Sequence, residues 1–166
     1  MEKRNFFEEY LIMPNNLAEV KVEIVLPNYN SEAYLDETIN SIINQTFKNW
    51  KLTIVDGNSN DETQRILQNY IRHPNINIIR LKKNKRAGFC RNLAMRSSNL
   101  DYVAFIDSDD IWDREKLSKQ LDFMIKNDYH FTYTNYLPFK SEKKRQDLKE
   151  IKPENIFTYE KFVKNT

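Results

Sequence analysis

The sequence contains the stretch Phe105-Ile106-Asp107-Ser108-Asp109-Asp110-Ile111-Trp112, in which three carboxylates follow a short apolar run. The run begins at Tyr102 and is typical of a buried strand. Acids this close together repel one another, and a hard divalent ion that also holds a diphosphate is the usual way to neutralise them. On an extended backbone, residues two apart point to the same side, so we expect Asp107 and Asp109 to address one ligand. The alternative is that these acids cap a helix beginning near Asp113.

The composition limits the class of protein. The chain has 166 residues, 40% of them hydrophobic and 13% aromatic, which suits a single folded domain. The formal charge is only +2, which gives no electrostatic case for a nucleic-acid partner. The single cysteine, Cys90, and the two histidines provide neither an internal disulfide nor a zinc site, so we expect a reducing, cytoplasmic setting. No apolar run approaches the roughly 20 residues that span a bilayer.

Strand and helix patterns alternate along the chain. Strands are predicted at Val20–Leu26, Leu52–Val55, Ile76–Leu81, Tyr102–Ile106 and Tyr129–Tyr136, and helices at 35–43, 66–71, from 87 onward and at 117–125. This alternation predicts an α/β fold with a mainly parallel sheet and helices on both faces. Ligands of such sheets bind beyond the carboxyl ends of the strands. The turns at Tyr29, Asp56 and Asp107 should therefore share one edge.

These motifs, in their order and spacing, resemble family 2 of the inverting glycosyltransferases, which have the Rossmann-like GT-A fold. The resemblance runs from about Val20 to Tyr136. It is carried by five stretches, namely Ile24–Asn30, Asn44–Phe47, Ile54–Asp61, Arg91-Asn92 and Phe105–Asp110.

The resemblance implies roles for individual residues. It assigns nucleotide-sugar binding to Pro27, Tyr29, Asn30, Asp56, Arg91, Asp107 and Ser108. Tyr29 would stack on the base, Asp56 would hold the nucleoside, and Arg91 would meet the diphosphate. Asp107 would face the ribose or the metal, and Asp109 would be the principal ligand of Mn²⁺ or Mg²⁺. The alternatives are that Tyr29 packs its own turn, that Asp56 caps the next helix, and that Arg91 pairs with a nearby acid.

The implied activity is metal-dependent, inverting transfer of a sugar from a nucleotide-diphosphate donor, UDP by default, to a glycan or lipid-linked acceptor. It also implies peripheral association with the inner face of the membrane. Two features depart from the family pattern. Gly57 stands where the family usually has a second acid, which leaves base recognition open. The general base of the family lies on a segment well after the Asp-x-Asp loop, and we expect it beyond Thr166.

We therefore expect an N-terminal lead at residues 1–19, a nucleotide-sugar-binding domain at 20–139, and a charged loop with the start of a truncated acceptor-side segment at 140–166. A non-catalytic nucleotide-sugar-binding remnant is the main alternative. A phosphatase of the haloacid dehalogenase type also uses Asp-x-Asp after an apolar strand, but normally near the chain start. A dinucleotide-binding oxidoreductase would need Gly-x-Gly-x-x-Gly after its first strand, and no glycine follows Leu26 there.

Overall fold

The computed structural model describes residues 16–100, 102–138 and 150–152. Most of the expected lead at 1–19 and of the expected charged segment at 140–166 lies outside these ranges. The chain divides into two compact units, Met1–Asp128 and Tyr129–Thr166. No helix within the described ranges is both long enough and apolar enough to span a bilayer.

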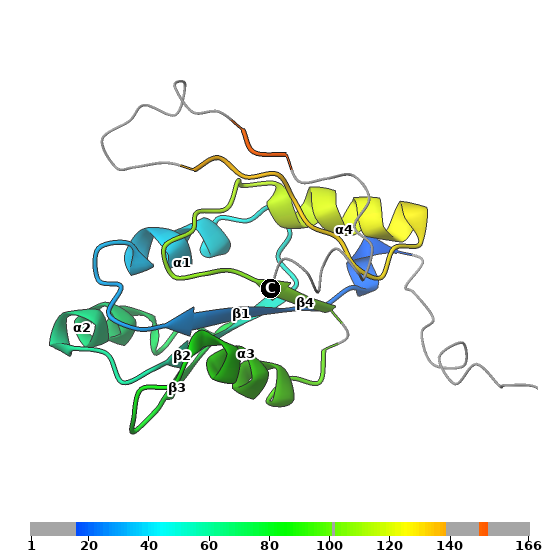
Figure 1. The fold of residues 1–166 in the computed structure, drawn as a ribbon. Helices are drawn as coiled ribbons and strands as arrows, with labels where there is room; N and C mark the ends of the chain where they lie inside the picture. The colour runs from blue at the N-terminus through cyan, green and yellow to red at the C-terminus, as the bar shows by residue number, and fades with distance from the viewer. Residues whose placement is uncertain (1–15, 101, 139–149, 153–166) are drawn as a thin grey trace, which may run out of the picture. The chain divides into compact units, whose positions relative to one another are not determined.

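The first unit is built on a parallel four-stranded sheet with the strand order β3-β2-β1-β4 (Figure 1). The strands are β1 Val22–Asn28, β2 Trp50–Asp56, β3 Ile76–Arg80 and β4 Tyr102–Phe105. The helices are α1 Leu35–Ile43, α2 Asp61–Tyr70, α3 Ala87–Arg96 and α4 Lys116–Asn127, with a short 3-10 turn, η1 Leu17–Glu19, before β1. The predicted parallel α/β architecture is confirmed.

The core lies on both faces of this sheet, because successive residues of a strand point to opposite sides. On one face, Ile24 and Leu26 of β1 pack in a cluster that includes Ile39 of α1 and Leu121 of α4. On the other face, Val25 packs in a smaller cluster that includes Cys90 and Ala94 of α3. Figure 1 shows α1 and α4 on one side of the sheet and α3 on the other.

The strand order reverses at β1, since β2 and β3 lie on one side of it and β4 lies on the other. In open α/β sheets this switch point, at the carboxyl ends of the strands, is where ligands bind. The pairing of β4 ends where Val25 meets Phe105, whereas β1 continues beside β2 to Asn28. Pro27 therefore lies where β1 has only β2 beside it, a place that tolerates a residue without an N–H.

The predicted strand at Tyr129–Tyr136 is wrong. α4 ends at Asn127, and its C-cap residue Asp128 has a left-handed backbone (φ 55°). Among the described residues that follow, the one β-pairing is an isolated bridge between Tyr136 and Ile151. Tyr129 is 48% exposed and Phe131 is 74% exposed. Alternating aromatic residues predict a strand only where another strand pairs with them, and Ile151 is the one bridge partner in the described part of this unit.

Candidate functional site

The Asp-x-Asp segment is held against α1 by polar side chains of that helix. The Thr38 hydroxyl donates to the carbonyl oxygen of Ser108 (3.0 Å), and the Trp112 N–H donates to the Ser41 hydroxyl (3.2 Å). Thr38 and Ser41 are three residues apart, so they lie on the same face of the helix. α1 therefore fixes the backbone from which the acids project.

Gln45 extends this attachment beyond the end of α1. Its fully buried amide donates to the carbonyl oxygen of Asp113 (2.7 Å) and accepts from the backbone N–H of Leu117 (3.0 Å). The backbone N–H of Thr46 donates to the carbonyl oxygen of Arg114 (3.0 Å). These bonds give a physical reason for the Asn44–Phe47 stretch, whose polar residues tie α1 to the segment leading into α4.

The acids themselves lie on a turn and not on extended backbone. The N–H of Asp110 donates to the carbonyl oxygen of Asp107 (3.1 Å), which closes the turn. The argument that Asp107 and Asp109 point the same way because they are two apart on a strand is therefore wrong. The capping alternative also fails, because α4 begins at Lys116 and its N-cap residue is Glu115.

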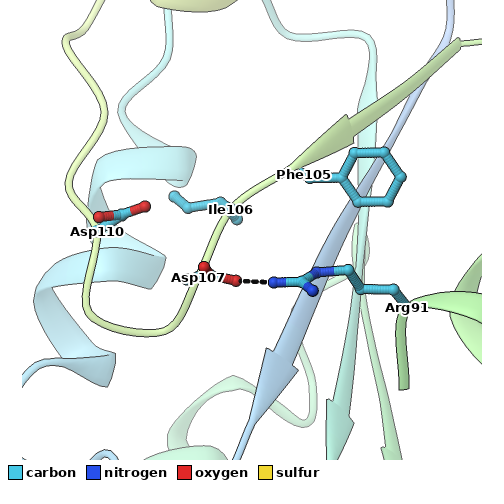
Figure 2. Close-up of a pocket in the computed structure, with 5 residues that line it drawn as sticks. All are labelled: Arg91, Phe105, Ile106, Asp107 and Asp110. Atoms are coloured by element: carbon cyan, nitrogen blue, oxygen red, sulfur yellow. Dashed lines mark hydrogen bonds and ion pairs between the residues drawn. The ribbon is translucent and has the colours of Figure 1, made fainter. Parts of the chain in front are cut away.

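A hollow of about 320 Å³ opens beside this turn, and we call it the acidic hollow (Figure 2). It is lined by Arg91, Phe105, Ile106, Asp107 and Asp110. It lies at the carboxyl end of β4, on the expected edge of the sheet. Asp109 is on the same turn but is not among its lining residues.

Arg91 reaches from α3 to Asp107, and one guanidinium nitrogen lies 2.5 Å from a carboxylate oxygen (Figure 2). The two side chains are 34% and 54% exposed, so the pair contributes little to stability. Pairing with a nearby acid was the alternative expected for Arg91, and the structure forms that pair. Both groups nevertheless remain accessible to a ligand.

The acidic hollow has excess negative charge. Burial raises the pKa of the Asp110 carboxyl above its ordinary value, and the neighbouring charges of Asp109 and Asp107 raise it further. The carboxylates of Asp107 and Asp110 in the hollow, with that of Asp109 on the same turn, are oxygen donors of the kind that Mg²⁺ and Mn²⁺ prefer. Within the described residues no three acidic, histidine or cysteine side chains converge as a complete metal site. An ion held here would take further ligands from a substrate and from water.

Asp56 lies at the carboxyl end of β2 and is fully buried. Its carboxylate accepts from the Asn28 amide (2.7 Å), the Gln64 amide (2.6 Å), and the hydroxyl and backbone N–H of Ser59. The side chain that caps α2 is Asn60, which accepts from the Thr63 N–H (3.0 Å). Asp56 is therefore not the helix cap, and in this structure it ties the end of β1 to the loop after β2.

The loop after β1 carries the other predicted ligands. Asn30 has a positive φ of 47°; its N–H donates to the Ser59 hydroxyl (2.9 Å), and its side chain accepts from the Asn60 N–H (2.8 Å). These bonds hold the loop in place beside the loop after β2. Tyr29 is 49% exposed and Pro27 is buried.

Asn84, in the loop before α3, was not singled out by sequence reasoning. A Cβ added to Gly57 would lie 3.2 Å from the Asn84 side-chain oxygen and 3.5 Å from the Tyr29 ring. The place where the family usually has a second acid is thus bordered by a carboxamide and an aromatic ring. Asn84 is the one residue of the run 82–86 that is not basic, but nothing in the sequence indicates that it lies beside Gly57, because that contact depends on the fold.

Three comparisons bear on the identity of the chain. The profile of Glycosyl transferase family 2 matches residues 23–166. The putative teichuronic acid biosynthesis glycosyltransferase TuaG of Bacillus subtilis (strain 168) is 36% identical over 146 residues, which cover 87% of this chain and 58% of TuaG. The Escherichia coli enzyme WfgD, named a UDP-Glc:alpha-D-GlcNAc-diphosphoundecaprenol beta-1,3-glucosyltransferase, is 34% identical and is matched over 87% of this chain and 55% of its own length.

The crystal structure of Staphylococcus aureus TarS 1–349 in complex with UDP matches with a TM-score of 0.60 and 32% identity, covering 64% of this chain and 32% of that one. The chain spans just over half the length of the two curated relatives. Because the family profile covers most of the sequence and the fold agrees, the chain belongs to glycosyl transferase family 2.

Proposed function

We propose that the chain is the donor-binding part of a metal-dependent, inverting glycosyltransferase that transfers a sugar from a nucleoside-diphosphate donor to a glycan or lipid-linked acceptor. One observation carries the proposal: the loops after β1 and β4 meet the switch point of the sheet. There they present an exposed tyrosine and an acidic hollow with one arginine. A stacking ring, a cation for phosphate and carboxylates for a metal are the groups that a nucleoside diphosphate requires.

A UDP-sugar is the donor that we favour. TarS structures contain UDP and UDP-GlcNAc, and the name of WfgD gives UDP-glucose as donor and a lipid diphosphate as acceptor. Tyr29 offers a face on which a pyrimidine would stack. Asn84 supplies both a donor and an acceptor beside Gly57, and this carboxamide would read the edge of the base.

Each charged residue of the site has a proposed task. Arg91 would exchange Asp107 for the diphosphate, since guanidinium groups bind phosphate in a bidentate manner. Asp107 and Asp109 would hold Mn²⁺ or Mg²⁺, with Ser108 between them in contact with the donor. The metal, when bound, neutralises the charge that develops on the departing diphosphate. Inverting transfer also needs a carboxylate that deprotonates the acceptor hydroxyl, and we assign that role to no described residue.

Calorimetry with UDP tests the donor site. We expect the affinity of the unchanged chain for UDP to rise when Mn²⁺ is added. In the presence of Mn²⁺, the double variant Asp107→Asn, Asp109→Asn should bind UDP at least about tenfold more weakly than the unchanged chain. Asp122→Asn is the matched control, because Asp122 is an exposed acid on α4 paired with Lys126. Equal manganese-dependent affinity in the double variant and the control would refute the proposal.

A transfer assay then separates the remaining activities. The assay would supply UDP-glucose or UDP-GlcNAc with a lipid diphosphate acceptor, and the anomeric configuration of the product would be read by NMR. A product with the inverted configuration supports the proposal. Manganese-dependent binding without transfer identifies a non-catalytic donor-binding chain, and hydrolysis of simple phosphate esters identifies a phosphatase.

A further inference from the structure

A second hollow lies at the opposite edge of the sheet, and we call it the basic hollow. Its volume is about 330 Å³, and its lining residues include Lys21, Lys48, Asn49, Trp50, Lys51 and Asn75. These residues precede or open β1, β2 and β3. Because the strands are parallel, their amino ends meet at one edge, so the basic hollow and the acidic hollow lie at opposite edges.

The walls of the basic hollow are fixed by the fold. The Asn49 amide donates to the carbonyl oxygen of Val20 (2.7 Å), and the Asn75 carbonyl accepts from the Leu52 N–H (2.8 Å). Trp50 is 5% exposed, and its ring stacks on that of His73 with the centroids 6.0 Å apart. A ligand would therefore meet a wall that is already in place, which reduces the entropic cost of binding.

Three ammonium groups surround this hollow, and they outnumber the acids beside them. Within the described part of the chain, Lys21 and Lys51 form no ion pair, and the Lys48 ammonium donates only to the carbonyl oxygen of Ile43 (3.1 Å). No acid is among the described residues that line the hollow. Two acids are close in sequence or register: Glu23, which is buried on β1 and in register with Lys51, and Asp101, which follows Leu100 and lies outside the described residues. Their two carboxylates still leave the three ammonium groups with positive charge in excess.

The hollow also includes a residue with an unused donor. The indole N–H of Trp50 is buried and has no hydrogen-bond partner in the described part of the chain. A buried donor without an acceptor is unfavourable, so native proteins usually supply one. Lysine ammonium groups and ring N–H groups are donors that lack any acceptor function, and their natural ligand is an anion with several oxygens.

We propose that the basic hollow binds a phosphate group, at a site separate from the donor edge. A phosphate carries up to two negative charges and several acceptor oxygens, which match three lysines better than a single carboxylate does. The phosphate has two possible sources, a free phosphate ion and the headgroup of an anionic lipid. Both present the same chemistry to the lysines, so experiment must distinguish them.

Trp50 provides a local probe for phosphate. The sequence has two tryptophans, so Trp112→Phe leaves Trp50 as the sole tryptophan, whose emission can be excited selectively over that of the tyrosines. In that background, inorganic phosphate should change the emission in a saturable way that sodium chloride at equal ionic strength does not reproduce. The triple variant Lys21→Gln, Lys48→Gln, Lys51→Gln should weaken this binding at least about tenfold. The indole N–H signal of Trp50 in the unsubstituted chain gives the same readout by NMR if Trp112→Phe folds poorly.

The matched control is Arg65→Gln, Lys119→Gln, Lys126→Gln. It removes the same amount of positive charge, but from exposed side chains that each pair with an acid. Arg65 and Lys126 pair with acids of their own helices, and Lys119 pairs with Glu115, the residue before α4. Flotation with phosphatidylglycerol vesicles, compared with phosphatidylcholine vesicles, tests the lipid source. If the lysine triple loses phosphate binding and the control keeps it, the basic hollow binds free phosphate. If the lysine triple loses binding to phosphatidylglycerol vesicles and the control keeps it, the hollow binds the lipid headgroup.

The proposal is overturned if neither probe binds, or if the lysine triple and the control behave alike. Calorimetry with UDP and Mn²⁺ on the same two variants separates this result from the donor site. Both variants should keep the donor affinity of the unchanged chain, because none of the six substituted residues lines the acidic hollow. If the unchanged chain binds phosphate but not UDP, the result counts against the donor site alone.

Discussion

Replacing Asp56 with asparagine tests whether this acid holds loops together. One carboxylate oxygen accepts from Asn28 and the Ser59 hydroxyl, and the other accepts from Gln64 and the Ser59 N–H. An amide has only one oxygen, so two of these donors would face an NH₂ group. Hydrogen bonds to a charged group contribute about 1.5–3 kcal/mol each, and removing a buried charge offsets part of the loss. We expect Asp56→Asn to lower the free energy of unfolding by about 3 kcal/mol.

Urea denaturation followed by circular dichroism measures this change, with UDP affinity measured on the same preparations. Glu62→Gln is the control, because Glu62 is an exposed acid paired only with Arg65, and its loss should cost under about 0.5 kcal/mol. The reasoning is refuted if Asp56→Asn unfolds within about 0.5 kcal/mol of the unchanged chain. Normal stability together with lost UDP affinity would instead make Asp56 a direct nucleoside ligand.

Three further changes test other parts of the structure. Gln45→Leu leaves the Leu117 N–H and the Asp113 carbonyl without their hydrogen-bond partner, so urea denaturation should show a free energy of unfolding lower by about 3 kcal/mol. Gln68→Leu, at an exposed position, should lower it by less than about 0.5 kcal/mol. Burial lowers the pKa of Lys116 to about 8, so above that pH the unfolded chain binds more protons than the folded chain. The free energy of unfolding should therefore rise by about 2 kcal/mol between pH ~7.5 and ~9.5. Lys116→Met should abolish this rise. Gly57→Asp displaces Asn84, and competition among UDP, CDP and GDP should then show a changed preference.

The sheet could be predicted from the sequence because its determinants are local. The β-branched run of β1 and the helical spacing in α1 each follow from a few neighbouring residues. Because a helix connects successive strands, parallel pairing is the arrangement that buries both faces of the sheet. The edge that carries the site follows from the same argument, since the loops after parallel strands must emerge together. Tyr129–Tyr136 shows the limit, because its alternation is local but a strand requires a partner.

Most of the arrangement of polar groups within the site was not predictable, because it depends on contacts between residues far apart in the sequence as well as on local ones. Asp56 accepts from Asn28, which is 28 residues earlier. The sequence allowed Arg91 to pair with an acid, but only the structure shows that this acid is Asp107. The turn at Asp107–Asp110 is held by α1, more than sixty residues earlier in the chain. A motif therefore indicates which chemistry is present, whereas the direction of each side chain depends on hydrogen bonds that become visible only in the folded chain.

Gly57 illustrates how such a departure from a family pattern becomes interpretable. From the sequence alone, the missing acid only leaves base recognition open. In the folded chain, a Cβ at this position would lie 3.3 Å from the carbonyl oxygen of Asn28, a backbone atom that cannot easily move, and close to Asn84. An acid would therefore have to displace Asn84 or shift the end of β1. The glycine and the carboxamide are thus sterically coupled, and a chain with an acid at this position should require a different residue, or a different backbone path, at position 84.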